Sequence, residues 1–184
     1  MSGEHRSRHR SKTARRIKKP NSPPQDQPWI WLTHEIMESL AWRSLSLAGR
    51  QVLDLVMLEH MAHAGCMNGD LVVPYDDLVK YGIDRRSIAK AIDLCVCLGF
   101  LDLIQRGIRA YGPSRRPSVY GLTWLDRCDR TFATNRWKNI RTVQDVAAAT
   151  AEVESLAEER SRAHEKRHAE HKERQELHRT AGLV

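Results

Sequence analysis

The sequence lacks long apolar runs, and the four residues 146–149 are among its longest. A membrane-spanning helix needs about 18–20 consecutive apolar residues, so no such helix is expected. The first thirty residues contain Arg and Lys but no apolar stretch of the kind that a secretory signal requires. We therefore expect a cytoplasmic protein with no membrane partner.

Cysteine is also scarce, with four residues in a chain of 184. Cys95 and Cys97 lie two positions apart in an expected helix, so their side chains point to different faces and cannot hold one metal ion together. We expect reduced thiols without disulfides, as is usual in the cytosol. His60, His63 and Cys66 follow one another at three-residue steps but have no evident fourth ligand, so no metal site is predicted.

The motifs of common enzyme classes are missing as well. The sequence has no phosphate-binding glycine loop, no nucleophile elbow and no carboxylate pair outside expected helix surfaces. Asp76 and Asp77 fit the first turn of a helix, where the helix dipole favours negative charge, better than a Mg²⁺ site. We expect no enzymatic activity and no cofactor.

Positive charge is abundant and unevenly distributed. The chain has 30 Lys and Arg against 23 Asp and Glu, and +6 of the net +7 falls in residues 1–28, which are also rich in Pro and Ser. Such a segment cannot bury enough apolar surface to offset its ordering entropy, so a disordered basic arm is predicted. Contacts to phosphates without sequence preference are expected from its residues Arg15, Arg16, Lys18 and Lys19, because each neutralised phosphate releases counterions.

Apolar spacing and capping residues predict the elements that follow the arm. They indicate helices at 34–40, from 47 to about 63, at 75–81 and at 85–98, with a short strand at 71–73. Strand patterns at 100–106 and 118–124 flank the loop 107–117, which carries three arginines and no acid. Two helices joined by a turn at Gly82 and followed by a hairpin form a helix-turn-helix with a basic wing.

The stretch LVVPYDDLVKYGIDRRSIAKAIDLCVCLGFLDL, followed by a hairpin that ends in SVYGLTWL, resembles the winged helix-turn-helix of bacterial, plasmid and phage regulators and replication proteins. The upstream segment SLAWRSLSLAGRQVLDLVMLEHM is similar to the lead helices of such proteins. The resemblance covers about residues 29–126 and departs from the pattern at Pro74, where many relatives have Ser or Thr. It implies a mainly α fold with a small β-hairpin.

The same resemblance implies a sequence-specific, nucleoid-associated protein that binds double-stranded DNA, either as a transcription regulator or as a replication-associated factor of a mobile element. The helix at 84–98 would read the major groove, and the wing would contact the flank. With Ile88 and Ile92 toward the core, a free outer face is expected to carry Lys90 and Asp93. The predicted DNA-contact residues are Arg85, Arg86, Ser87, Ala89, Lys90, Arg106, Arg109, Arg115 and Arg116.

A connector at 127–141 leads to an extended polar helix at 142–180. A short apolar stripe on this helix, formed by Val146, Ala149, Val153 and Leu156, suggests the hypothesis of a homodimer. Two alternatives to DNA binding stay open. The winged helix could be a protein–protein interaction module, or the arm could bind RNA, with Trp29 and Trp31 available to stack on bases.

Overall fold

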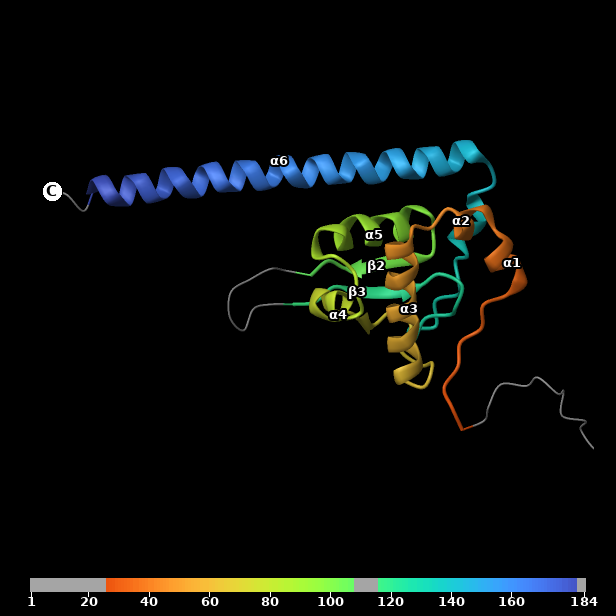
Figure 1. Cartoon of the computed structure of the whole chain (residues 1–184). Helices are drawn as coiled ribbons and strands as arrows, with labels where there is room; N and C mark the ends of the chain where they lie inside the picture. The colour runs from red at the N-terminus through yellow and green to blue at the C-terminus, as the bar shows by residue number, and fades with distance from the viewer. Residues whose placement is uncertain (1–25, 108–115, 182–184) are drawn as a thin grey trace, which may run out of the picture.

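The computed structural model describes residues 26–107 and 116–181. This part of the chain is mainly helical with a small three-stranded antiparallel sheet, as predicted (Figure 1). No helix in it is long and apolar enough to cross a membrane. The elements are α1 (His34–Glu38), α2 (Leu40–Arg43), α3 (Leu47–Ala62), β1 (Leu71–Val72), α4 (Tyr75–Lys80), α5 (Arg85–Cys97), β2 (Leu101–Gln105), β3 (Val119–Leu122), the 3₁₀ helix η2 (Arg136–Asn139) and α6 (Val143–Ala181).

Side-chain caps explain where several helices begin. The Ser46 hydroxyl accepts a hydrogen bond from Gly49 N at 3.1 Å at the start of α3, and Asp84 accepts one from Arg86 N at 2.8 Å at the start of α5. The single helix expected at 34–40 is instead two helices. Ser39 adopts an extended ψ of 147°, and its hydroxyl caps α2 by accepting from Trp42 N.

The sheet has the strand order β1-β3-β2, so the first strand pairs with the last strand of the hairpin. Leu71 lies opposite Tyr120 in one pair, and Leu101 lies opposite Leu122 in the other. A register shift between Leu103 and Gln105 interrupts the second ladder near the end at which β2 finishes and β3 begins. The hairpin therefore packs its base into the core through this register and sends its strand ends outward.

The core surrounds α3, whose buried residues contact α5 and the sheet. An aromatic cluster closes one end of it. Phe100 packs edge-on against Trp42 and Trp124, at centroid distances of 5.5 and 6.2 Å, and stacks on Trp137 at 6.3 Å. Such aromatic pairs add about 0.5–1.5 kcal/mol each beyond the burial of their area.

Buried polar contacts hold the segment after β3 against this core. The Asn68 side chain is buried; its amide donates to Leu122 O and Leu125 O, both at 2.9 Å, and its carbonyl accepts from Leu122 N at 2.7 Å. The Asp102 carboxylate pairs with Arg127 and with Arg136, the latter at 2.7 Å. These bonds direct the chain back across the molecule to the start of α6.

The long helix α6 begins with a reciprocal cap. Thr142 Oγ1 accepts a hydrogen bond from Asp145 N at 3.2 Å, and the Asp145 carboxylate accepts from Thr142 N at 2.8 Å. Hydrogen bonds from the backbone N–H groups of Arg141 and Thr142 lower the pKa of Asp145. From this cap α6 runs alongside α5 and then continues far past it (Figure 1).

Candidate nucleic-acid interface

The first turn of α5 presents cations to solvent. Arg85, Arg86 and Ser87 are exposed, and the turn is held in place by the Asp84 cap. Arg85 pairs with Asp76 of α4, whereas Arg86 has no ion pair among the described residues. Positive charge at a helix N-terminus opposes the helix dipole, so the interaction of these arginines with the dipole of α5 is unfavourable.

A groove of about 610 Å³ lies between this turn, the base of the hairpin and α6. Its floor includes Tyr75 and Tyr120. Burial, the larger cause, and the nearby Asp93 carboxylate raise the pKa of Tyr75, and burial raises the pKa of Tyr120 to about 12. Both phenols therefore keep their protons at neutral pH. Four arginines line the groove and come from α5, the hairpin and α6: Arg85, Arg106, Arg116 and Arg160. Two carboxylates, those of Asp76 and Asp93, line it as well.

This groove brings together four of the residues predicted to contact DNA: Arg85, Ala89, Arg106 and Arg116. Guanidinium and phenol groups are hydrogen-bond donors that suit phosphate oxygens. The groove can therefore bind an anionic group on the surface that joins α5 to the hairpin.

The outer face of α5 is partly covered by α6, so the expectation of a free face is wrong at Asp93, whereas Lys90 stays exposed. Lys90 Nζ lies 2.5 Å from Glu154 Oε1 of α6. The Asp93 side chain, only 6% exposed, pairs with Arg160 of α6. On this face the first turn of α5 and Lys90 are exposed, and α6 covers the helix at Asp93.

The apolar stripe of α6 packs within the same chain. Ala149 and Val153 are buried, and Val146 and Leu156 are partly buried. The contacts between α5 and α6 show which element covers this stripe. The surface suggested for a homodimer is therefore occupied, and this arrangement does not support self-association through it.

Arg160 is the site residue that sequence reasoning missed. The stripe positions 146, 149, 153 and 156 continue to 160 at the same three- and four-residue spacing, which could have placed Arg160 toward the body. Asp93 on the predicted outer face of α5 was the matching signal, because an acid there can pair with an arginine of another element. Several predicted contact residues lie outside the described part of the chain: Arg15, Arg16, Lys18, Lys19, Arg109 and Arg115.

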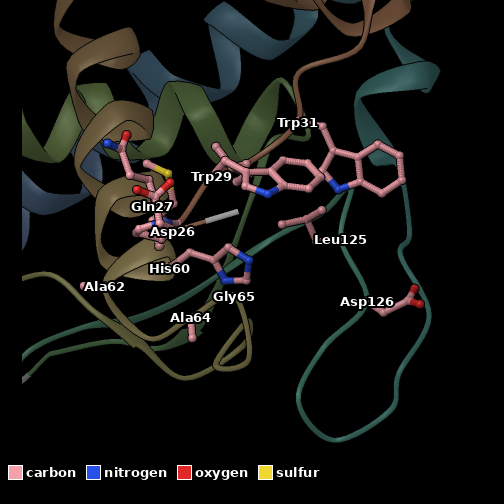
Figure 2. Close-up of a pocket in the computed structure, with 13 residues that line it drawn as sticks. Asp26, Gln27, Trp29, Trp31, His60, Ala62, Ala64, Gly65, Leu125 and Asp126 are labelled. Atoms are coloured by element: carbon pink, nitrogen blue, oxygen red, sulfur yellow. The ribbon is translucent and has the colours of Figure 1, made fainter. Parts of the chain in front are cut away.

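A second hollow, of about 760 Å³, lies beside the end of α3 (Figure 2). The indoles of Trp29 and Trp31 meet edge to face at 6.4 Å, and the His60 imidazole reaches the same space. Burial lowers the pKa of His60, which keeps the ring neutral at pH 7. The described lining contains the carboxylates of Asp26 and Asp126 but no Lys or Arg. This hollow can accept a flat apolar group, but it does not extend the cationic surface.

Comparisons with known protein families, with curated proteins and with solved structures gave no significant match for this chain.

Proposed function

We propose that this protein is a winged helix-turn-helix protein that binds double-stranded DNA at the end of the molecule where α5 begins. The observation that carries the proposal is the arginine-lined groove between the first turn of α5 and the base of the hairpin. The element order α3-β1-α4-α5-β2-β3 and the strand order β1-β3-β2 support this assignment. A role in transcription or in replication of a mobile element is part of the same proposal.

The partly covered outer face limits how α5 can read bases. Arg85, Arg86 and Ser87 form the open first turn, and the N-terminal residues of a recognition helix are the ones that usually reach base edges. Arginine binds guanine O6 and N7 with two hydrogen bonds, which discriminate against other bases by about 1–3 kcal/mol. We therefore assign base contacts to this turn and phosphate contacts to Arg106 and Arg116.

A second candidate function is a protein–protein interaction module. The coverage of α5 by α6 favours it, because Lys90 and Asp93 are used inside the chain rather than for an external ligand. The two functions predict different results for removal of Arg85 and Arg86: the DNA-binding protein loses duplex preference, and the interaction module does not.

Mobility shift with genomic fragments tests the proposal. An Arg85→Ala/Arg86→Ala variant is expected to lose about 10- to 100-fold of its preference for the favoured fragment over the others. An Arg43→Ala/Arg162→Ala variant, which removes the same charge from exposed positions on α2 and α6, is expected to keep that preference. If the Arg85/Arg86 variant shifts the favoured fragment as well as the parent does, the first turn does not read bases.

A further inference from the structure

Beyond Arg160, α6 extends away from the rest of the molecule. Residues 161–181 form 21 residues of continuous helix, about 31 Å long at 1.5 Å per residue. Every described side chain from 161 to 175 is exposed. Packing therefore does not explain this extension, and its surface chemistry must indicate what it contacts.

One face of the extension is the continuation of the face that packs on α5. The spacing that leads from Ala149 and Val153 to Arg160 continues through His164, Arg167, His171 and Arg174. At 3.6 residues per turn, these four positions lie within about 40° of the direction of Arg160. Arg160 reaches Asp93 on α5, so this face of the extension looks toward the side of α6 on which α5 lies. We call the residues Arg160, His164, Arg167, His171 and Arg174 the inner face.

The inner face has no acidic residue. Glu165, Glu170 and Glu173 are the acids on the same turns, and their positions on the helix lie about 140°, 80° and 140° away from the direction of Arg160. Glu170 comes nearest to the inner face, four residues before Arg174. Arg167 Nε donates to Ala163 O at 3.0 Å, and neither Arg167 nor Arg174 has an ion pair among the described residues. The described side chains therefore place no carboxylate in an ion pair with either arginine. The imidazoles between them can each donate one hydrogen bond even when neutral.

The inner face lies next to the proposed DNA site. Figure 1 shows that α6 passes the end of the molecule at which α5 begins, β2 ends and β3 begins. Arg160 belongs both to the inner face and to the groove that Arg85, Arg106 and Arg116 line. The groove and the inner face thus meet at Arg160, which pairs with Asp93, and the inner-face cations that are unpaired in the described part of the chain continue beyond it.

We infer that the inner face of α6 binds the phosphate backbone of the same duplex whose bases contact the first turn of α5. This inference rests on the proposed function. The acid-free charge favours a polyanion, and the absence of apolar residues on this face argues against a packed protein helix. In this arrangement α6 forms a second side of the binding site. The conformation in which α6 packs on α5 is then the one that binds DNA, and not an inhibited one.

Two matched variants test the inference. Arg167→Gln/Arg174→Gln removes two charges from the inner face, and Arg162→Gln/Lys166→Gln removes two charges from the opposite face of the same turns. Arg162 and Lys166 also have no ion pair among the described residues. Gln is a good helix former, and circular dichroism of both variants checks that the helix content is unchanged.

The measurement is fluorescence anisotropy of a labelled duplex at increasing KCl. Each lost phosphate contact lowers the slope of log K against log salt by about 0.9 in B-DNA. For the inner-face variant, the slope of log K against log salt is expected to decrease in magnitude by about 2, and the affinity at 0.1 M KCl to fall by about tenfold or more. For the opposite-face variant, the decrease in slope and the loss of affinity are each expected to be well under half as large.

Equal effects of the two variants, or no effect of either, would overturn the inference while leaving duplex binding by the parent protein intact. If the parent protein binds no duplex at all, the proposed function fails and the inference fails with it. Binding of a poly-glutamate peptide that depends on Arg167 and Arg174, with an unchanged duplex slope, would assign the inner face to an acidic protein instead.

Discussion

Gly99 stands where the chain leaves α5 and enters β2, and its φ of +81° lies in the left-handed region. Its surroundings are also closed. A Cβ at this position would lie 2.5 Å from Trp137 N and 2.6 Å from Arg136 C, which are backbone atoms that cannot rotate away. Gly82, between α4 and α5, has a φ of +104°, but the nearest atom to an added Cβ is Gln51 Nε2 at 3.7 Å. A side chain at Gly82 would therefore introduce backbone strain alone, whereas a side chain at Gly99 would introduce both strain and steric overlap.

We predict that Gly82→Ala lowers the free energy of unfolding by about 1 kcal/mol, the cost of a left-handed alanine. Gly99→Ala adds a backbone clash to this strain and is expected to cost about 3 kcal/mol or more. Urea denaturation followed by circular dichroism measures both values. Similar losses for the two variants would mean that the segment at 136–137 does not press on Gly99.

Single residues show where sequence reasoning reached its limit. The end of a helix near Gly99 could be predicted, because glycine often follows the last helical turn. The contact with Trp137 could not, because 38 positions separate the two residues and no local pattern joins them. Asn68 is a similar case. It reads as a turn residue, yet its side chain is buried and joins the turn to β3 and to the chain after it.

The elements were more predictable than their contacts. Spacing and caps located α3, α5 and the hairpin strands within a few residues, since these signals are local. The apolar stripe on α6 was also visible, but periodicity identifies a face and not the surface that covers it. The structure places α5 under this stripe, which buries Asp93 of the expected outer face of α5 and leaves the first turn as the candidate site.

The ion pair between Arg160 and Asp93 joins α6 to α5, and its contribution to stability can be measured by substitution. Removing Arg160 leaves a buried carboxylate without its partner, and an uncompensated buried charge is strongly destabilising. Arg160 itself is partly exposed, so solvent softens the effect. We predict that Arg160→Ala lowers the free energy of unfolding by about 2 kcal/mol, whereas Arg162→Ala changes it by less than about 0.5 kcal/mol.

A second substitution shows whether the loss comes from the orphaned charge. In an Arg160→Ala/Asp93→Asn variant no charge is left in the buried position, so most of the lost stability is expected to return. Urea denaturation of the two single variants and the double variant completes the cycle. A double variant as unstable as the sum of the single ones would contradict coupling between these two residues.

Across the whole molecule, positive charge gathers in several places, among them the connector at 127–141 with five basic residues and one acid. Two of these places bear on the proposed function: the surface formed by the groove and the inner face, and the sequence-defined arm at 1–28, most of which lies outside the described residues. Base contacts carry sequence information, whereas the contacts expected from the arm are to phosphates and act through counterion release. Specificity and general affinity should therefore be separable in this chain.

Neutralising the arm tests this separation. In an Arg15→Gln/Arg16→Gln/Lys18→Gln/Lys19→Gln variant, affinity is expected to fall by the same factor for every duplex, and the salt slope should decrease by up to about 3.6. The ratio of affinities for the favoured and other fragments should stay constant, because these residues release counterions without reading bases. Anisotropy titrations with two duplexes at several KCl concentrations measure both quantities. If the variant instead loses all duplex binding but the Arg85→Ala/Arg86→Ala variant keeps it, the arm is the nucleic-acid site, and RNA becomes the ligand to test first.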